Sequence, residues 1–416
     1  MRLLLVGWGS RGDVVPLLAV GRGLTEAGHQ VSVATARDLA PLVTEAGLES
    51  RIFDISLERD QDPVVKDWLA GSSAGRRELQ LMRAAFAHFG PILGRGLADH
   101  VADADAVISG IISTAGLAPW ARRAGRPLIA ATLLPQLPTA LADATLYPMR
   151  AGSSWLNRLA GRAQLAVGHT LFGPPTRAIQ RKLGLRPEGL RGYLAALNQV
   201  PTVIGVSPLL LPPPPDWPAH VRVTGAWRQP LAPDYRPPAP LADFLAGPDD
   251  VVYIGFGSMP NLDPGQLRSL VIAAVEQVGL RAVLAGVLHE GGAPVTPLTN
   301  SVVSIATTPF GWLFPRLRAV VAHGGVGTTD AALLAGRPLA VIPHIGDQYF
   351  WGRRVHALGA GPVPLPRQDL SVAALAGRLD ALLQPGRQAA AAELGHRMAA
   401  EDGVAHAVRF IHERIS

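Results

Sequence analysis

The sequence contains no cysteine, which excludes disulfide bonds and a cysteine nucleophile. No uninterrupted apolar run approaches the roughly 20 residues that a membrane-spanning helix needs. Basic residues outnumber acidic ones by 38 to 32, but they are scattered and form no run interleaved with aromatic residues. The excess therefore does not indicate nucleic-acid binding and supports only a mild attraction to phosphorylated small molecules. We expect a cytoplasmic protein with no integral membrane segment, and peripheral membrane contact stays open.

Short apolar runs separated by helix-like segments are abundant. Runs without polar alternation are typical of parallel strands that are covered on both faces. They are RLLLVG, QVSVAT, DAVISG, RPLIAAT and PTVIGVS in the first half, and DVVYIGFGS, RAVLAG, VVSIAT, AVVAHGG and PLAVIPH in the second. The helical stretches between them predict right-handed crossovers. At 416 residues the chain is long enough for two doubly wound parallel sheets in tandem.

A proline-rich segment separates the two halves. Ten prolines fall within residues 211–240, and proline lacks a backbone donor and fixes φ. We interpret this segment as a semi-rigid linker between an N-terminal domain, residues 1–210, and a C-terminal domain, residues 241–400. Residues 401–416 form a last helix-like stretch that can pack back on the N-terminal domain. Because ligands of such sheets bind beyond the carboxyl ends of the strands, two facing sheets predict a site in an interdomain cleft.

The segment GWGSRGD, residues 7–13, contains a G-x-G-x-x-G pattern that is typical of dinucleotide-binding turns. Three features argue against that use. Asp13 carries a charge where the helix terminus should attract a pyrophosphate. Pro16 predicts a helix that begins near that residue and not at Gly9. The second run leads to Arg37, where an NAD site has an acidic residue; Arg37 suits a 2′-phosphate, so an NADP site stays open.

Two other interpretations of this loop are available. In the first, Gly9 and Gly12 adopt left-handed turns and the loop presents the carboxylate of Asp13 to the cleft, with Ser10 and Arg11 beside it. In the second, Asp13 only caps the following helix. The loop alone does not decide between them.

The segment AVVAHGGVGTTDAALLAG carries a stronger pattern. A predicted strand over residues 319–322 ends at His323, which can donate a hydrogen bond to a phosphate oxygen. The glycines let backbone N–H groups approach an anion, and the helix N-terminus adds unpaired donors and about half a positive charge. Two threonine hydroxyls add further donors. The residues after the histidine are Gly324, Gly325, Gly327, Thr328 and Thr329. The pattern predicts a diphosphate site without an obligatory metal.

Residues that suit the rest of a nucleotide sugar follow neighbouring runs. Asp347 and Gln348 can accept from and donate to vicinal hydroxyls, although Asp347 also suits a helix cap. Ser258 offers a second phosphate contact. Trp312 is either a ring that stacks on a nucleobase or a core residue.

The middle of the first half is rich in apolar side chains that suit a hydrophobic acceptor, although we expect most of them to be ordinary core. They are Trp68, Met82, Phe86, Phe89, Leu134, Leu146, Tyr147, Met149, Trp155 and Phe172.

Three segments together carry a resemblance to a known family: GSRGDVVPLLAVGRGLTEAGHQVSVAT, WLFPRLRAVVAHGGVGTTDAALLAGRP and GDQYFWGRRV. They resemble the sterol 3-beta-glucosyltransferase branch of the nucleotide-sugar-dependent glycosyltransferases, and they are similar to natural-product enzymes of the vancomycin type. The resemblance spans the chain and is weakest from Arg59 to Val200. It implies the GT-B fold, with two facing Rossmann-like domains, an inverting mechanism, and no cofactor or metal.

The resemblance also implies roles for individual residues. Asp13 would be the general base, with Ser10 and Arg11 near the diphosphate. His323 would assist departure of the nucleoside diphosphate. The remaining matches are Gly324, Gly325, Thr328 and Thr329 to the diphosphate loop HGGxGTT, and Asp347 and Gln348 to the sugar-binding pair of GDQ. Asp330 and His344 depart from the family pattern, and His344 bears on which sugar is accepted.

We therefore expect an inverting hexosyltransferase that uses a UDP- or dTDP-sugar and a hydrophobic acceptor. The composition, rich in alanine, arginine and proline, favours a bacterial secondary metabolite, as in antibiotic biosynthesis, over a sterol. The open alternatives are an NADP-dependent oxidoreductase that uses the first loop, a nucleotide-sugar epimerase or lipid-linked sugar transferase of the same fold, and a non-catalytic protein that binds sugar nucleotides.

Overall fold

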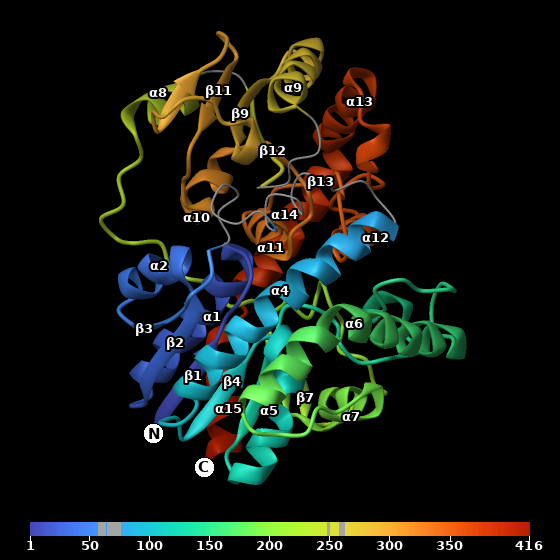
Figure 1. The fold of residues 1–416 in the computed structure, drawn as a ribbon. Coiled ribbons are helices and arrows are strands. Elements are labelled where there is room, and N and C mark those ends of the chain that lie inside the picture. The colour runs from blue at the N-terminus through green and yellow to red at the C-terminus, as the bar shows by residue number, and fades with distance from the viewer. Residues whose placement is uncertain (57–63, 65–75, 248–249, 258–262) are drawn as a thin grey trace. The chain divides into compact units, whose positions relative to one another are not determined.

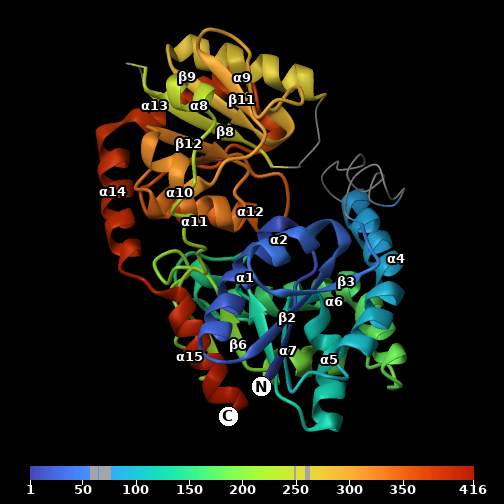
Figure 2. The same ribbon diagram turned by 90° about the vertical axis from the view of Figure 1, so that its left-hand side faces the viewer.

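The computed structural model describes residues 1–416 apart from 57–63, 65–75, 248–249 and 258–262. The chain forms two compact units, Met1–Gln229 with Asp402–Ser416, and Pro230–Glu401. Each unit has helices on both sides of one largely parallel sheet (Figures 1 and 2). The prediction of two doubly wound sheets in one chain is confirmed.

The sheet of the first unit has the strand order β3-β2-β1-β4-β5-β6-β7, and every neighbouring pair is parallel. Its strands are β1 (Arg2–Val6), β2 (Gln30–Ala36), β3 (Glu49–Phe53), β4 (Ala106–Ser109), β5 (Leu128–Thr132), β6 (Thr202–Ile204) and β7 (Val221–Val223). The chain order reverses between β1 and β4. Sheets of this type bind ligands at such a reversal, and the loop that follows β1 carries Asp13.

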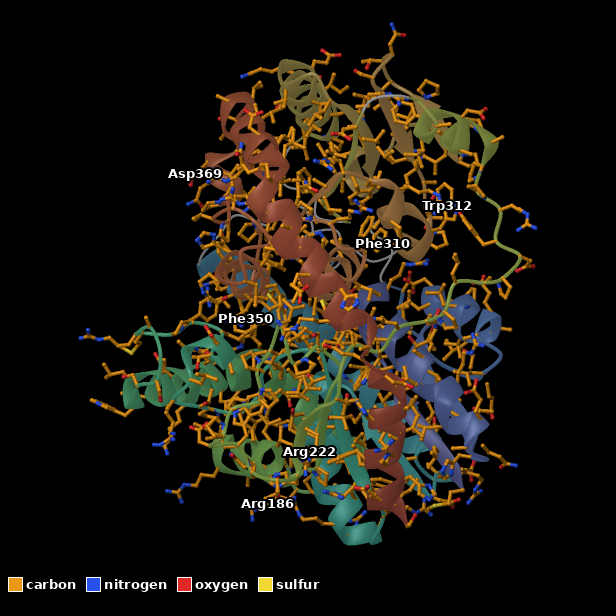
Figure 3. The ribbon with its side chains drawn as sticks, turned by 180° about the vertical axis from the view of Figure 1, so that it is seen from behind. Arg186, Arg222, Phe310, Trp312, Phe350 and Asp369 are labelled. Atoms are coloured by element: carbon orange, nitrogen blue, oxygen red, sulfur yellow. The ribbon has the colours of Figure 1, made fainter. Side chains whose placement is uncertain are left out.

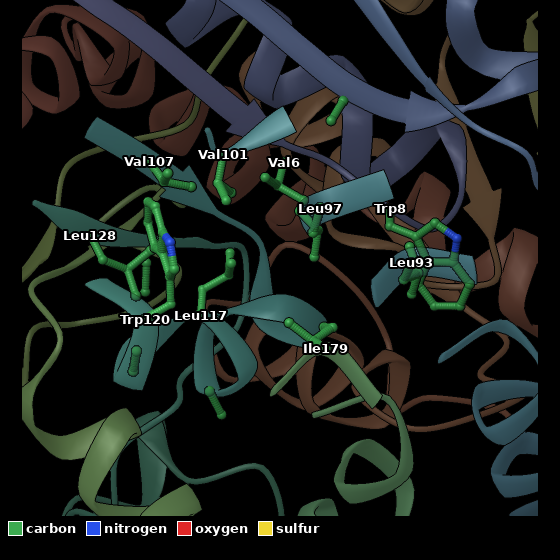
Figure 4. Packing of buried hydrophobic residues seen from close by; sticks show 14 of the residues in the cluster. Val6, Trp8, Leu93, Leu97, Val101, Val107, Leu117, Trp120, Leu128 and Ile179 are labelled. Carbon is green, nitrogen blue, oxygen red and sulfur yellow. The ribbon is translucent and has the colours of Figure 1, made fainter. Parts of the chain in front are cut away.

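Alternate side chains of β1 enter two different cores, as the pleat of a strand requires. Leu3 and Leu5 pack with α1 (Arg11–Glu26) and α15 (Gly403–Ile415), whereas Leu4 and Val6 pack with α4 (Arg76–His100) and α5 (Ile111–Ala124). Figure 4 shows the second core, where Trp8 lies beside Leu93. The helices of this unit are α1 (Arg11–Glu26), α2 (Ala40–Glu45), α4 (Arg76–His100), α5 (Ile111–Ala124), α6 (Trp155–Lys182), α7 (Leu190–Gln199) and α15 (Gly403–Ile415).

The proline-rich segment is organised differently from our expectation. We expected residues 211–240 to be a linker, but β7 lies inside them and pairs with β6, and the boundary between the units falls after Gln229. No proline lies between residues 219 and 229, so this edge strand keeps its backbone donors. At the other end of the chain, α15 packs on α1 within the first unit.

Helix α1 begins at Arg11, so the expectation that it begins near Pro16 is wrong. The first four N–H groups of a helix have no intrahelical acceptor, and Pro16 is the sixth residue. Its ring therefore removes a single hydrogen bond close to the helix start, where Ser10 and Asp13 already hold the backbone.

The sheet of the second unit has the order β10-β11-β9-β8-β12-β13. Its strands are β8 (Val251–Gly255), β9 (Arg281–Ala285), β10 (Val295–Pro297), β11 (Val302–Ile305), β12 (Ala319–Ala322) and β13 (Leu339–Val341). The short edge strand β10 was not expected and is antiparallel to β11, whereas the other pairs are parallel. The carboxyl ends of β8, β12 and β13 are adjacent, and the predicted nucleotide residues follow them.

The helices of the second unit are α8 (Ala239–Leu245), α9 (Pro264–Val278), α10 (Phe310–Leu313), α11 (Val326–Leu334), α12 (Gln348–Ala357), α13 (Val372–Leu383) and α14 (Pro385–Ala399). Val252 and Ile254 of β8 pack with α9 and α13 in one core. In the described ranges of both units, no helix combines the length and apolar character that crossing a bilayer requires.

Candidate functional site

The loop after β1 places the carboxylate of Asp13 in the first turn of α1. Its Oδ2 accepts hydrogen bonds from the backbone N–H of Ser10 at 2.8 Å and from the Ser10 hydroxyl at 2.9 Å. Among the described residues, no hydrogen bond reaches Oδ1, and the residue is exposed. Solvent reaches the side chain, yet the surrounding protein atoms desolvate the carboxyl and raise the pKa of Asp13, against the effect of the two bonds from Ser10. Asp13 is thus a helix cap with one oxygen that can accept a proton.

Gly9 makes room for this carboxylate. Its φ is 137°, a region that side chains rarely adopt, and a Cβ at this position would overlap Oδ2 of Asp13. The expectation of a left-handed turn at Gly12 is wrong, because Gly12 is a helical residue of α1. A Cβ at Gly12 would meet only the Ser10 hydroxyl, at 3.4 Å. The geometry favours a loop that presents Asp13. Arg11, the first residue of α1, is exposed.

Arg37, which would have contacted the 2′-phosphate of NADP, forms an ion pair with Asp54. Both side chains are exposed, so the pair itself contributes little stability. It nevertheless occupies the guanidinium, and this weakens the NADP interpretation.

In the second unit, His323 follows β12 and leads into a tight glycine turn. Gly324 has a φ of 92°, and a Cβ there would lie 2.5 Å from Cγ1 of Val341. A Cβ on Gly325 would lie 2.7 Å from Nε2 of His323. Gly324 therefore requires glycine, whereas a side chain at Gly325 would displace the ring of His323. A Cβ on Gly327 would meet open space, so no steric reason requires glycine there.

Helix α11 begins directly after this turn, with Gly325 as its N-cap. The first intrahelical N–H bond runs from Thr329 to the carbonyl of Gly325, at 3.0 Å. The N–H groups of Val326, Gly327 and Thr328 precede it, and in the described part of the chain they have no acceptor. Three unpaired donors at the positive end of a helix dipole form a favourable site for an anion.

The two threonines of this turn differ in their contacts. Thr329 is fully buried, and its hydroxyl donates to the carbonyl of Gly325 at 3.0 Å. Its proton is therefore engaged inside the helix, which differs from our expectation that both hydroxyls would face an anion. Thr328 is partly exposed, and no side-chain hydrogen bond of Thr328 is found among the described residues. Thr328 is the better donor to a ligand.

His323 is partly buried, and burial lowers the pKa of its imidazole, with the nearby carbonyl of Gly255 acting in the opposite direction. The ring is therefore neutral near pH 7. Its Nδ1 is buried and forms no hydrogen bond with the described residues. A neutral imidazole beside the start of α11 can donate one hydrogen bond to an anion without adding a charge.

The loop between β13 and α12 is held by Gln348. Its Oε1 accepts from the backbone N–H of His344 at 2.7 Å and of Ile345 at 3.1 Å. Only the amide N–H₂ of Gln348 is left for a ligand, whereas we expected both ends of the amide to serve one. Asp347 lies at the N-cap of α12, and its Oδ2 accepts from the indole of Trp351 at 2.9 Å. Asp347 and Gln348 thus lie in the loop where we expect a sugar site, and each also accepts a hydrogen bond from another residue of the protein.

Trp312, which is labelled in Figure 3 together with Phe310, lies on α10. It is 9% exposed, and the Arg316 guanidinium carbon lies 4.5 Å from the centre of its ring. Tyr235 approaches the same ring at 6.0 Å. Little ring surface is left for a nucleobase, so this environment favours the core interpretation.

His344 and Asp330, the two residues that depart from the family pattern, are both buried. His344 lies against Phe256 with 5.7 Å between ring centres, and its Nδ1 is 2.9 Å from the carbonyl of Ile342. Burial lowers the pKa of His344 to about 4, so the ring is neutral and Nδ1 carries the proton. Asp330 is a buried residue of α11.

The apolar residues proposed for an acceptor fall into two groups. Phe86 and Phe89 are buried beside Trp8, and Met82 and Phe172 pack against the same core. The exposed group consists of Tyr147, Met149 and Trp155, whereas Leu134 and Leu146 are partly buried and belong to neither group. Trp68 and Ser258 lie outside the described residues. Within the described part, no cluster of three or more His, Cys, Asp or Glu side chains could hold a metal ion.

Sequence reasoning missed Gly286, which follows β9 at the same edge of the second sheet. It has a φ of 69°, and a Cβ there would lie 2.5 Å from the carbonyl oxygen of Gly257. A glycine directly after a predicted strand was the available indication. The close approach of these two loops sets the position of the Gly257 backbone next to His323, whose Cε1 would be 3.2 Å from a Cβ on Gly257.

Two family models match the chain. One is the glycosyltransferase family 28 N-terminal domain, over residues 3–93. The other is the erythromycin biosynthesis protein CIII-like C-terminal domain, over residues 269–412. The second match includes the turn after β12 and the loop before α12.

Sterol 3-beta-glucosyltransferases are similar to this chain along nearly its whole length. Identity to UGT80A2 of Arabidopsis thaliana is 31% over 432 residues, covering 98% of this chain and 65% of the plant protein. Identity to the enzyme of Emericella nidulans is also 31%, over 438 residues, covering 97% of this chain and 29% of the fungal protein. The chain thus spans less than two thirds of the length of these relatives.

Solved structures of natural-product glycosyltransferases share the fold. The glycotransferase of kitacinnamycin has a TM-score of 0.70 at 19% identity, with 100% of this chain and 99% of that chain covered. The calicheamicin glycosyltransferase CalG4 has a TM-score of 0.69 at 20% identity, with coverage of 100% and 98%. VinC, solved with dTDP, has a TM-score of 0.62 at 19% identity, with 99% of each chain covered.

The family models match both units, the motifs lie at the carboxyl ends of the strands, and the fold is that of solved glycosyltransferases. The chain belongs to the GT-B glycosyltransferases, in the group of the sterol 3-beta-glucosyltransferases and the natural-product glycosyltransferases.

Proposed function

We propose that this chain transfers a hexose or deoxyhexose from a UDP- or dTDP-sugar to a hydroxyl group of a hydrophobic acceptor, with inversion at the anomeric carbon. The observation that carries the proposal is the start of α11, where three unpaired N–H groups, a tight glycine turn and the neutral ring of His323 lie together. This donor set suits a diphosphate, whose oxygens accept several hydrogen bonds and carry negative charge.

In the proposed reaction, Asp13 takes the proton of the acceptor hydroxyl through Oδ1 as the oxygen attacks C1 of the sugar. The new C1–O bond forms as the bond from C1 to the phosphate oxygen breaks, and its electron pair leaves with the nucleoside diphosphate. Charge that develops on the leaving oxygens is stabilised by the N-terminus of α11 and by His323. Asp347 and the amide N–H₂ of Gln348 contact the sugar hydroxyls, and Arg11 contributes positive charge near the diphosphate.

The hydrophobic acceptor that we propose is either a sterol or another natural product. The curated relatives are named for a sterol, and the structural neighbours are named for natural products. The composition, rich in alanine, arginine and proline, favours a bacterial secondary metabolite. A transfer assay that offers a sterol and a phenolic polyketide to the same enzyme, with each of the two donor nucleotides, separates these possibilities by product mass.

The alternative functions give different assay results. An epimerase converts the nucleotide sugar without an acceptor, and a binding protein leaves it unchanged. An oxidoreductase would be stabilised by NADPH, but here Asp13 lies where a pyrophosphate would sit and Arg37 is paired with Asp54. Thermal shift with NADPH, UDP and dTDP therefore tests the oxidoreductase directly.

The role of Asp13 is tested by Asp13→Asn. We expect turnover to fall by about 10²–10⁴-fold, the usual contribution of a general base, while nucleotide affinity is retained. Asp402→Asn is the matched control, because Asp402 caps α15 in the same unit by accepting from Ala405 at 2.9 Å. Near-normal turnover of Asp13→Asn, or an equal loss in Asp402→Asn, contradicts the assignment.

A further inference from the structure

The helix α6 and the loop before it carry an unusual number of exposed apolar side chains. Eleven large hydrophobic residues are exposed in the described part of the chain, and five of them fall within residues 147–167. Trp155 is 70% exposed, Met149 61% and Leu159 49%. In Figure 1, α6 and this loop extend to one side of the first sheet. Single exposed apolar residues are normal, but a group of this kind marks an interaction surface.

The exposed group belongs to an ordered structure. Asn157 of α6 is fully buried, and its Oδ1 accepts from the backbone N–H groups of Met149 and Arg150, both at 2.9 Å. Its Nδ2 donates to the carbonyls of Ala140 and Arg150, both at 3.0 Å. The loop is therefore fastened to the helix, so that Met149 and Arg150 are held in the same lobe as the start of α6.

Basic residues accompany the apolar ones, and this stretch of the sequence contributes no acidic residue. No Asp or Glu occurs from residue 144 to residue 187, whereas the same stretch contains six arginines and one lysine. Trp155, Leu159 and Arg162 are spaced by four and three residues, which places them on one face of α6. Arg158 pairs with Asp216 at 2.6 Å, but no ion pair of Arg162 is found among the described residues. The exposed face thus combines apolar side chains with positive charge.

A hollow of about 410 Å³ adjoins this face. Arg158 and Arg162 line it from α6 together with the apolar Leu165, and Leu194 lines it from α7. Asp216 also lines the hollow and neutralises Arg158, so the guanidinium of Arg162 beside Leu165 and Leu194 is the group that suits an anion attached to a hydrocarbon chain.

From these observations we infer that the surface formed by the loop before α6 and the outer face of α6, defined by Met149, Arg150, Trp155, Leu159 and Arg162, docks the protein on an anionic lipid bilayer. Tryptophan and arginine are the side chains that settle at the boundary between head groups and acyl chains. A second copy of the chain fits this face poorly, because a two-fold contact would place the same basic residues against one another. The inference does not depend on the proposed sugar transfer, because lipid binding is measured without any substrate.

The test is co-sedimentation of the full chain with vesicles of phosphatidylcholine alone and of phosphatidylcholine mixed with phosphatidylglycerol. We expect binding to the anionic vesicles only, and weaker binding as salt is raised. Arg162→Gln should lower the partition coefficient about fivefold, the effect of about 1 kcal/mol per basic residue at an anionic surface. Trp155→Ser should lower it by roughly tenfold, because the ring no longer enters the interface.

Matched controls lie outside this face. Arg222→Gln removes an exposed arginine of β7 (Arg222 is labelled in Figure 3), and Val363→Ser removes an exposed apolar residue of the second unit. Both controls should bind anionic vesicles as the parent does, and circular dichroism should show all four variants folded. Equal binding to both vesicle types, no binding at all, or a loss in the controls that matches the loss in Trp155→Ser would overturn the inference. So would a concentration-dependent dimer that Trp155→Ser abolishes.

Discussion

The two glycines that flank Ser10 and Arg11 should respond in opposite ways to alanine. At Gly9, the φ of 137° is unfavourable for any side chain, and the added Cβ would occupy the place of Oδ2 of Asp13. At Gly12, the backbone is helical and the new methyl group would make an ordinary contact with Ser10. Gly9→Ala therefore moves the carboxylate and strains the loop, whereas Gly12→Ala does neither.

The magnitudes follow from these two environments. A side chain held in a sparsely populated backbone region costs about 1–3 kcal/mol, which lowers Tm by roughly 2–4 °C per kcal/mol for a unit of this size. Displacing a catalytic group by ~1 Å can cost about 10²-fold in rate, so the loss of turnover in Gly9→Ala should exceed its loss of stability. Gly12→Ala should stabilise the unit by about 0.4–1 kcal/mol, because alanine is the better helix former and narrows the unfolded ensemble.

The measurements are thermal unfolding and initial rates of sugar transfer on the two variants and the parent. A dinucleotide-binding turn predicts instead that both variants lose activity, because there the second glycine lets the backbone approach the pyrophosphate and the third allows close packing of helix and strand. If Gly12→Ala loses more activity than Gly9→Ala, the loop does not serve Asp13 in the way its geometry indicates. An unchanged rate in Gly9→Ala would have the same meaning.

Three further predictions concern single contacts. The hydrogen bond from the Ser10 hydroxyl stabilises the ionised form of Asp13, so Ser10→Ala should raise the pKa of Asp13. Because the base must be ionised, the acidic limb of the kcat/KM profile should move to higher pH, and an unmoved limb counts against Asp13 as the base. Thr328→Val should weaken UDP or dTDP binding measured by calorimetry, whereas Thr329→Val should lower stability by about 1 kcal/mol in thermal unfolding with little change in affinity, and the reverse pattern would show that Thr329 is the ligand contact. His344→Phe should change the ratio of kcat/KM values for glucosyl and deoxyhexosyl donors with little change in nucleotide affinity; an unchanged ratio removes His344 from donor selection.

The sequence predicted the ten buried strands but not β3, β7 and β10. Parallel strands in the middle of a sheet are covered on both faces and therefore appear as continuous apolar runs. The three missed strands lie at sheet edges, where one side of the ladder is unpaired. In β3, ESRIF, only Phe53 is buried, and β7 and β10 have three residues each. Such strands are defined by pairing with a neighbour, which a single sequence does not contain.

The positions of the site residues were easier to predict from the sequence than the hydrogen bonds that their side chains form. The turn after β12 follows from the spacing of its glycines, because a close backbone approach has few other solutions. The partners of Thr329 and Gln348 depend on which way each side chain turns after the backbone has formed. Pro16, in contrast, was given too much weight, because Ser10 and Asp13 form a local capping box over three residues that secures the start of α1 and that the sequence itself indicates.

Glycine serves opposite electrostatic purposes in the two loops. In the first unit, the missing side chain of Gly9 leaves room for a carboxylate that the protein itself supplies, and that carboxylate already occupies the first turn of α1. In the second unit, the turn at Gly324 and Gly325 leads to a helix start whose N–H groups have no acceptor in the described chain. A helix N-terminus that already holds a carboxylate has little attraction left for a phosphate, whereas an unoccupied one retains it. The presence or absence of an acidic residue in the first helical turn therefore separates the two uses of a glycine-rich turn. On this ground we propose the second unit as the diphosphate site, although the first carries the more familiar pattern.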